Sequence, residues 1–473
     1  MKFKQAYKRI PKQVKASAVI LLSSFINGAM NFLTVPIFTR ILSIEEYGLT
    51  AQYYSWLNII AVFATLSLSA GVYHVAMNEY PEDRYGFSFS ATILSNICTC
   101  VVFFFIFLFK DFFSAFFHLN EKLLLLMFIN LLICPAMDMW LAMQRYEYHY
   151  QRVAAISIGS SVISQIGSLI LVTVIKDTNL GVVKLFATQG ILIFFAMFIY
   201  IGVARKSHWK PKISYIKFAL LFNLPLLLHY LAQYVLRSTD KIMITHFIGE
   251  GATGIYSLAA NVANISMIAW SAMSASLTPY VYSHISTNEY KKVNRSVIGV
   301  EALFAICCVG ISFIGPEIVY ILGSDKYMCG IYLIPPIAAS CLLAAIYSFY
   351  STIAFYYHKT TSTAVMTIIA ATVNVILNYI FIPRYGYVAA AYTTEGAYLI
   401  YTLLHFLNYR RIVKENRIYN DWMIGGIVIL ATALCLLSGL LYQFYILRYL
   451  IILVGVVLLV IFGSKVFKMI KEN

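Results

Sequence analysis

Long apolar runs recur along this chain from one end to the other. A helix of about 20 apolar residues spans the hydrocarbon core of a bilayer, because each residue rises about 1.5 Å across about 30 Å. About fourteen such runs lie near residues 17–39, 52–77, 88–109, 123–143, 153–175, 181–203, 214–236, 253–280, 296–321, 330–356, 362–382, 387–408, 421–441 and 447–464. The sequence therefore predicts an all-α polytopic membrane protein with about fourteen transmembrane helices.

The composition fits lipid as the main solvent of the folded chain. Hydrophobic residues make up 61% of the sequence and charged residues 12%, against roughly 25% charged in soluble domains. The segments between runs are of loop length, so we predict no separate catalytic headpiece and no catalytic residues. The eight cysteines lie almost entirely within apolar runs and lack metal-ligand spacing. We therefore expect neither a metal nor a cofactor.

The excess of basic residues is interpreted as a topology signal. A formal charge of +15 would suggest a nucleic-acid partner in a soluble protein. With the amino terminus in the cytoplasm, most of the 35 Lys and Arg residues fall on the cytoplasmic side, as the positive-inside rule requires. Residues 1–15 resemble a signal peptide, but the apolar run that follows suits a retained first span. We predict an inner-membrane, multi-pass protein with both termini cytoplasmic and no nucleic-acid partner.

Glycine-containing junctions repeat along the chain. Gly48 and Gly254 lie 206 residues apart (254 − 48), and Gly181 and Gly386 lie 205 apart (386 − 181). Parallel repeats of this kind are a transporter architecture, although recurring glycine turns could also coincide. We predict a six-helix bundle at 1–212, a second at 213–412, and two additional helices at 413–473, with the two bundles around a central cavity.

One apolar run carries a polar stripe. His229, Gln233, Arg237 and Asp240 follow one another at spacings of four, four and three, and Lys241 is adjacent. These residues share one face of a helix, so they are predicted to line a hydrated cavity. The alternative is that the charged members lie at the membrane interface and extend toward water.

Three further groups are candidates for binding or ion coupling. Asn31 lies on a neutral polar face of the first run, which Arg40 follows, and such a face could equally pack against another helix. Glu395 lies near the middle of an apolar run, so it is protonated, paired or exposed to water. It is a candidate for ion coupling, or else makes a structural hydrogen bond. Asp138, three residues after Pro135, is a weaker candidate.

Three stretches carry a family resemblance: VPIFTRILSIEEYG, STDKIMITHFIGEGATGIYSLA and NVILNYIFIPRYGYVAAAYTTEGAY. In this order and spacing they resemble the multidrug/oligosaccharidyl-lipid/polysaccharide exporter (MOP) superfamily, most closely its polysaccharide-flippase (Wzx-type) branch. The family often shows Gly-Ala-Ala after the last Tyr-Gly, where this chain has residues 389–391 as three alanines. Close backbone packing at that point is therefore expected to differ.

The resemblance implies a V-shaped pair of helical bundles that opens alternately to each side. Its implied substrate is a polyprenyl-diphosphate-linked oligosaccharide, such as an O-antigen or capsule repeat unit for lipopolysaccharide biosynthesis, flipped from the cytoplasmic to the outer leaflet of the lipid bilayer. A polysaccharide polymerase and a chain-length regulator would be partners. The expected substrate-binding residues are Arg40, Arg237, Lys241, His229, Gln233 and Asn31, and the expected ion-coupling residues are Asp240, Glu395 and Asp138.

Three other functions remain alternatives. A drug/cation antiporter of the same superfamily would have twelve spans and, commonly, an acidic site in its amino-terminal half. A peptidoglycan-precursor flippase would share the fold and the fourteen spans. A polysaccharide polymerase or membrane glycosyltransferase would need a substantial outer loop with acids or arginines, and the outer loops here are short. A basic cavity would favour diphosphate and an acidic one organic cations.

Overall fold

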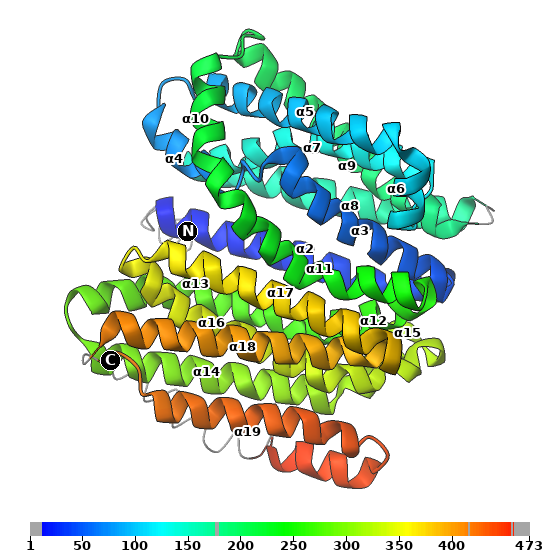
Figure 1. Ribbon diagram of the computed structural model, residues 1–473, viewed down its shortest axis with the longest axis vertical. Coiled ribbons are helices and arrows are strands. Elements are labelled where there is room, and N and C mark those ends of the chain that lie inside the picture. The colour runs from blue at the N-terminus through cyan, green and yellow to red at the C-terminus, as the bar shows by residue number, and fades with distance from the viewer. Residues whose placement is uncertain (1–11, 176–178, 415–416, 456, 458–473) are drawn as a thin grey trace, which may run out of the picture. The chain divides into compact units, whose positions relative to one another are not determined.

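The computed structural model describes residues 12–175, 179–414, 417–455 and 457, and within these ranges the chain is helical with no β-strand (Figure 1). The chain divides between Ser238 and Thr239 into two compact units, called unit 1 and unit 2 here. The all-α class predicted from the sequence is confirmed. The predicted bundle boundaries at 212/213 and 412/413 stay predictions.

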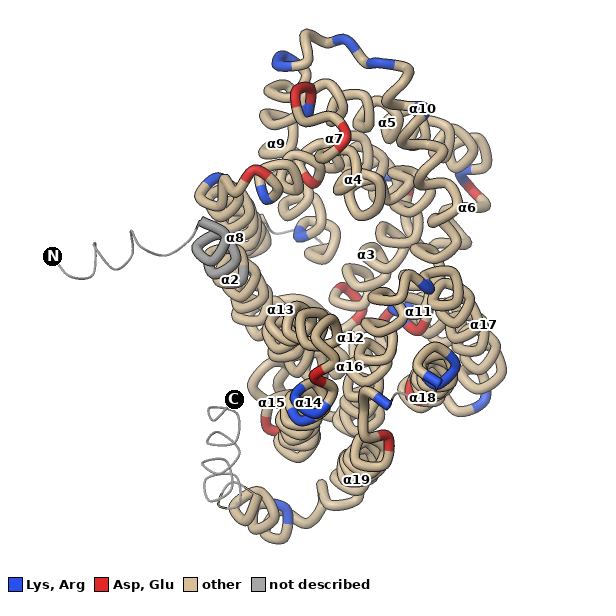
Figure 2. Tube along the Cα trace, turned by 90° about the vertical axis from the view of Figure 1, so that its left-hand side faces the viewer, with Lys and Arg blue, Asp and Glu red and all other residues tan. Residues whose placement is uncertain are grey.

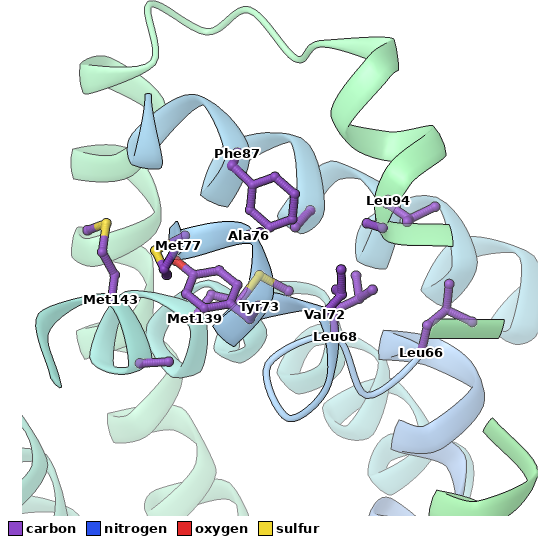
Figure 3. Packing of buried hydrophobic residues seen from close by; sticks show 13 residues of the cluster. Leu66, Leu68, Val72, Tyr73, Ala76, Met77, Phe87, Leu94, Met139 and Met143 are labelled. Atoms are coloured by element: carbon purple, nitrogen blue, oxygen red, sulfur yellow. The ribbon is translucent and has the colours of Figure 1, made fainter. Parts of the chain in front are cut away.

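In the part of unit 1 that the structure describes there are nine α-helices and the start of a tenth. These are α2 (Lys12–Ile41), α3 (Ile44–Thr65), α4 (Val72–Glu79), α5 (Arg84–Leu108), α6 (Lys110–Phe117), α7 (Glu121–Tyr146), α8 (Tyr150–Val174), α9 (Leu180–Lys206), α10 (Ile213–Asn223) and, after the 3-10 turn η1 (Leu224–Leu226), α11 (Leu227–Phe247). Figure 3 shows part of its apolar core, where Val72, Tyr73 and Met77 meet Phe87 and Met139. Burial of these side chains ties the short α4 to α5 and α7.

Unit 2 receives the end of α11 and is built around one buried helix. Its other elements are α12 (Glu250–Ala263), α13 (Ile265–Ser286), α14 (Tyr290–Phe313), α15 (Gly315–Gly323), the 3-10 helix η2 (Asp325–Leu333), α16 (Ile334–Tyr356), α17 (Thr360–Tyr385), α18 (Tyr387–Val413), α19 (Asp421–Leu440) and a short apolar helix, Tyr445–Gly455. α16 packs against α12, α13, α14, α18 and α19, which explains why most of its side chains are buried.

Among the described residues, nine helical segments are long and apolar enough to cross a membrane by length and composition. They are Arg84–Leu108, Glu121–Tyr146, Tyr150–Val174, Leu180–Lys206, Ile213–Phe247, Tyr290–Phe313, Asp325–Tyr356, Thr360–Tyr385 and Asp421–Leu440. The chain is therefore a multi-pass membrane protein, while the number fourteen stays a prediction. Residues 1–11, residues 456 and 458–464 of the last predicted span, and the carboxyl tail after it lie outside the described residues.

The predicted span at 52–77 is wrong as a single helix, because α3 ends at Thr65 and α4 begins at Val72. Leu66 and Ser67 have positive φ angles of 51° and 49°, which a right-handed helix cannot continue through. Asn223 of α10 holds the break: its amide nitrogen donates to the Leu66 carbonyl oxygen, and its Oδ1 accepts from the Val72 N–H at 3.0 Å. A Cβ at Gly71 would collide with Asn223, so this turn needs glycine.

Several basic residues of unit 2 lie at helix ends. Figure 2 shows Lys and Arg at the ends of α14 and α18 within unit 2. α14 begins with Tyr290-Lys-Lys, and the last turn of α18 holds Arg410 and Arg411. The start of one helix and the end of the other thus form a basic end of unit 2, which is the distribution that the positive-inside interpretation requires.

An ion pair at one end of unit 1 gives a pH-dependent prediction. Asp83 caps α5 by accepting from the Gly86 N–H at 3.1 Å, and its carboxylate also accepts from Lys212 and, at 3.0 Å, from Tyr215. Partial burial alone would raise the pKa of Asp83, but Lys212, Tyr215 and Gly86 together hold that pKa below its usual value. Because the folded-state pKa is lowered, the stabilisation is present at neutral pH and lost as the pH falls through that pKa.

We expect Asp83→Asn, which keeps the cap, to lower the melting temperature of the detergent-solubilised protein slightly at pH 7. The gap to the wild type should close at low pH, where Asp83 is itself protonated. A gap that stays constant from pH 7 to pH 3 would contradict this account of the ion pair.

Candidate functional site

A buried carboxylate in unit 2 is the centre of the candidate site. Asp240, on α11, is only 5% exposed. Its Oδ2 accepts hydrogen bonds from the hydroxyls of Tyr256 and Thr394, each at 2.7 Å. Its Oδ1 accepts from the amide nitrogens of Asn378 at 2.7 Å and Asn374 at 3.4 Å. Burial removes the water that would hydrate this carboxylate, which is costly. The four donors compensate for that loss with hydrogen bonds.

The residues that donate to Asp240 also form hydrogen bonds with one another, which holds their side chains in place. The Asn374 amide also donates to Thr394 Oγ1 at 3.0 Å, and the Asn378 amide to Asn374 Oδ1 at 3.2 Å. Thr393 donates to Asn378 Oδ1. Asn374 and Asn378 are four residues apart on α17, so both face α18 and α11. We call this set the Asp240 network: Asp240, Tyr256, Asn374, Asn378, Thr393 and Thr394.

The Asp240 network presents oxygen atoms from one carboxylate, two amides and three hydroxyls. Such oxygens are the ligands that hard cations prefer, and a carboxylate can also take up a proton. Among the described residues there is no group of three or more His, Cys, Asp or Glu placed to hold a metal ion. The carboxylate is the one charged group of the network, so it is the member whose charge a proton or a cation would neutralise.

The predicted repeat pairs two residues of the Asp240 network with residues of unit 1. The 206-residue offset pairs Asp240 with Thr34 (240 − 206) and Tyr256 with Thr50 (256 − 206). In unit 1, Thr34 donates to backbone carbonyls of its own helix and to Gln165 Oε1 at 3.5 Å. Thr34 thus carries a neutral hydroxyl at the position that the predicted repeat pairs with Asp240 of unit 2.

The basic residues predicted to bind the substrate are distributed over both units. Arg40 and Arg237 are exposed, at the end of α2 and on α11 in unit 1, and Lys241 is half-buried in unit 2. Lys241 follows Asp240 directly, so its side chain leaves the helix in a different direction. A shared role for these three cations remains a prediction.

The neutral residues predicted to bind the substrate form two local pairs. The side chains of His229 and Gln233, one turn apart on α11, are hydrogen-bonded at 3.2 Å. Asn31 accepts from the Gln165 amide at 2.8 Å, which joins α2 to α8. The polar face of the first run therefore does pack against another helix, the alternative left open by the sequence, but Asn31 also remains exposed.

The other two predicted coupling acids lie outside the Asp240 network. Glu395 follows Thr394 on α18, but its side chain is half-buried and makes no hydrogen bond to the network residues. Asp138 is exposed on α7 of unit 1. The described hydrogen bonds of Asp240 thus involve neither Glu395 nor Asp138.

Sequence reasoning named Asp240 but not its partners as site residues. Asn374, Asn378 and Tyr256 lay within the stretches that carried the family resemblance, without a role. The sequence did contain a sign of these partners. Two asparagines lie four residues apart in one apolar run, and a Thr-Thr pair lies in the next run along the chain. Polar residues at helical spacing inside a span are costly unless they have partners.

Several apolar helices long enough to span a membrane, with a hydrogen-bonded acid buried among them, are typical of a membrane transporter. A family model described as polysaccharide biosynthesis protein matches residues 14–285, and the MatE model matches residues 225–380. The chain therefore belongs to the polysaccharide biosynthesis protein family of the MOP superfamily. The polysaccharide-flippase branch and the transporter class predicted from the sequence are confirmed.

Relatives at low identity span most of the chain. A protein of the Lsg locus of Haemophilus influenzae is 22% identical over 74% of this chain and 86% of its own length. The "Probable low-salt glycan biosynthesis flippase Agl15" of Haloferax volcanii is 21% identical over 83% and 82%. Among solved structures, the lipid II flippase MurJ in an inward closed conformation has a TM-score of 0.67 at 17% identity, covering 94% of this chain and 98% of that one. The structural likeness shows a shared fold.

Proposed function

We propose that this protein flips polyprenyl-diphosphate-linked oligosaccharide repeat units from the cytoplasmic to the outer leaflet of the membrane, coupled to a cation gradient. The observation that carries the proposal is the family match over more than half of the chain. A relative named as a glycan biosynthesis flippase and the fold shared with a lipid II flippase support the same substrate class. The surface polysaccharide is an O-antigen or a similar glycan, assembled with a polymerase and a chain-length regulator.

The substrate poses two chemical problems. A diphosphate cannot cross hydrocarbon without neutralising cations, and Arg and Lys neutralise it through charge-assisted hydrogen bonds. Arg40, Arg237 and Lys241 take this role in our proposal. The hydroxyls of the sugars need neutral donors and acceptors, which Asn31, His229 and Gln233 offer. The polyprenol chain remains in lipid, where it costs nothing to solvate.

Ion coupling is assigned to Asp240 first. A carboxylate that binds a proton or a sodium ion changes the charge of its unit, and a buried charge shifts the balance between conformations by several kcal/mol. An ion at Asp240 would take the place of the N–H and O–H donors that bond its two oxygens in this structure. Glu395 and Asp138 are secondary candidates because neither belongs to this network. The membrane is the inner membrane, and both termini are cytoplasmic.

The diphosphate role gives a direct test. Arg40→Ala and Arg237→Ala should each abolish surface polysaccharide assembly in cells, because loss of one charge-assisted contact to a phosphate costs about 1.5–3 kcal/mol. The measurement is surface glycan, normalised to the membrane level of each variant by immunoblot. Lys210→Ala, at an exposed loop position, is the control for loss of a basic residue. Normal assembly in both arginine variants would remove this binding site.

Transport assays on the purified protein distinguish the proposed function from the two alternative transport functions. In proteoliposomes we expect transport of polyprenyl-diphosphate oligosaccharide and none of an organic cation. Transport of lipid II alone would make the protein a peptidoglycan-precursor flippase. Transport of the organic cation alone would make it an antiporter.

A further inference from the structure

Two neighbouring helices of unit 2 enclose an apolar groove. α17 and α18 run side by side (Figure 1), and the groove lies between them near the turn that joins them, with a volume of about 410 Å³. Ligand pockets in proteins commonly measure about 300–1,000 Å³. The lining is mostly apolar and includes Leu377, Phe381 and Tyr385 of α17 and Ala389, Tyr392 and Thr393 of α18. Such a surface suits a hydrocarbon chain and offers little to a sugar or a phosphate.

Aromatic rings from both helices line the groove. Phe381 and Tyr385, one turn apart on α17, are stacked with their ring centroids 6.0 Å apart, and Tyr392 lies on α18. Each of these three rings is at least a third exposed, so their surfaces stay available to a ligand. Aromatic rings provide a large apolar contact area.

A small side chain on α18 leaves room in the groove. Ala389 is the first of the three alanines at residues 389–391, and it lines the groove. It is 8% exposed. A bulky side chain at this position would occupy part of the groove, which gives a direct way to test what the groove holds.

An arginine shares the groove face of α17. Arg384 follows Leu377 by seven residues and Phe381 by three, and this helical spacing places all three on one face. Arg384 is exposed, and no described residue forms an ion pair with it. A guanidinium binds phosphate through charge-assisted hydrogen bonds. A cation beside an apolar groove fits a ligand that has a phosphate at the end of a hydrocarbon chain.

The groove lies at the end of unit 2 away from its basic end. α17 begins after Lys359 and ends at Tyr385, and α18 then runs back to Arg410 and Arg411. The predicted topology places the basic end in the cytoplasm. The groove then belongs to the outer half of the membrane.

The groove also touches the Asp240 network. Thr393 lines the groove and donates a hydrogen bond to Asn378. The amide of Asn378 in turn donates to Asp240 at 2.7 Å. Thr393 is therefore shared by the groove and the network, so a ligand that moves this side chain would change the hydrogen bonds of Asn378.

We infer that the α17–α18 groove binds the isoprenyl chain of the lipid-linked oligosaccharide next to its diphosphate, with Arg384 contacting the phosphate. This inference rests on the proposed function, which supplies the carrier lipid, and the rest of the chain stays in lipid. Lipid solvates hydrocarbon as well as a protein groove does, so binding depends on close packing and on the cation. The carrier has a single chain joined directly to its phosphate, which fits one groove beside one cation. A phospholipid carries two chains on a glycerol.

Photocrosslinking tests the groove without transport. The probe is a polyprenyl diphosphate with a diazirine on the isoprene unit nearest the diphosphate, added to the full chain in nanodiscs of phosphatidylethanolamine and phosphatidylglycerol. We expect cross-links within residues 377–393, located by peptide mass spectrometry. Unlabelled polyprenyl diphosphate should remove them, and the same amount of added phosphatidylglycerol should not. Equal removal by phosphatidylglycerol would make the occupant an ordinary membrane lipid, and cross-links only elsewhere would also overturn the inference.

Two variants test the shape of the groove. Ala389→Phe places a ring in the groove and should lower cross-linking several-fold. Leu399→Phe, at an exposed position of α18 outside the groove lining, is the matched control and should label as the wild type does. Tyr392→Ala removes an aromatic wall without adding bulk, so it gives the answer if Ala389→Phe does not fold. Full labelling of a folded groove variant would contradict the inference.

A third variant tests the cation. Arg384→Ala should weaken the competition by unlabelled polyprenyl diphosphate about tenfold, because one charge-assisted contact is lost. Competition by the uncharged polyprenol should not change. Lys326→Ala, at an exposed base of η2, is the control. Equal competition in Arg384→Ala and the wild type would remove Arg384 from the site.

Transport in proteoliposomes separates this inference from the proposed function. If the wild type moves no lipid-linked oligosaccharide, the proposed function is wrong, and cross-linking still reports whether the groove binds the isoprenyl diphosphate. If the wild type transports, folded Ala389→Phe and Arg384→Ala should be slower. Normal transport by both variants would show that the groove is no part of the substrate site.

Discussion

Replacing Asp240 with asparagine is expected to abolish cation-driven transport while leaving unit 2 folded. Asparagine has nearly the same shape, and its carbonyl oxygen can still accept from the Asn378 amide, which now donates to Oδ1 at 2.7 Å. The negative charge is lost, however, and the new NH₂ group faces the hydroxyls of Tyr256 and Thr394. Loss of a charged ligand is worth about 3 kcal/mol, so cation binding should weaken on the order of a hundredfold.

The measurement is transport in proteoliposomes under an imposed sodium or proton gradient, with protein folding checked by size-exclusion profile and melting temperature. Glu395→Gln is the informative comparison, because Glu395 follows Thr394 on α18 but makes no hydrogen bond to the network residues. We expect Glu395→Gln to keep most of its gradient response. If Glu395→Gln loses the response and Asp240→Asn keeps it, the coupling site has been assigned to the wrong acid.

Asn378 shows which part of the site could not be predicted from the sequence. Its amide joins Asp240 Oδ1 to Asn374 Oδ1, and its own Oδ1 accepts from Thr393. The sequence could identify Asp240 because an acid inside an apolar run is conspicuous. It could not identify which helices would meet that acid, because α12 and α17 are separated from it by up to 138 residues. Only tertiary packing brings Asn378 and Thr394 to Asp240.

The break between α3 and α4 shows the same limit for the fold. Residues 52–77 contain no proline and are apolar enough to suggest one continuous helix. The backbone nevertheless turns at Leu66 and Ser67, because Asn223, more than 150 residues away, satisfies the groups that the break exposes. Hydrophobic periodicity predicts that a segment is helical and buried. It does not reveal a distant side chain that satisfies the backbone hydrogen bonds left open by a break in the helix.

Burial of Glu301 could have been suspected from the sequence but not its lack of partners. The acid lies among apolar residues in the run near 296–321, and in the structure it is fully buried with no hydrogen-bond partner among the described residues. Whether such an acid is paired depends on the side chains of α13, α16 and α19 that surround α14. The packed structure is what distinguishes a satisfied acid from an unsatisfied one.

The second large effect concerns a buried cation that the sequence analysis did not single out. Arg448 has no exposed surface, and its Nη2 donates to Glu317 Oε1, with Glu317 about a third exposed. Tyr449 donates to the same oxygen at 2.6 Å. The guanidinium lies 5.1 to 5.8 Å from the ring centroids of Tyr442, Tyr445 and Tyr449, at distances where cations interact favourably with aromatic faces. This cluster joins α15 to the segment that follows α19.

Arg448→Ala should therefore lower the stability of the detergent-solubilised protein substantially. Removing one partner of a buried ion pair costs about 3–5 kcal/mol, and the lower end applies here because Glu317 retains some contact with solvent. Thermal unfolding measures the effect. The double variant Arg448→Met with Glu317→Gln should be more stable than Arg448→Ala, since no charge is then left without a partner and the methionine fills the space among the three tyrosines. A single variant as stable as the wild type would show that the rings, rather than the ion pair, hold this segment in place.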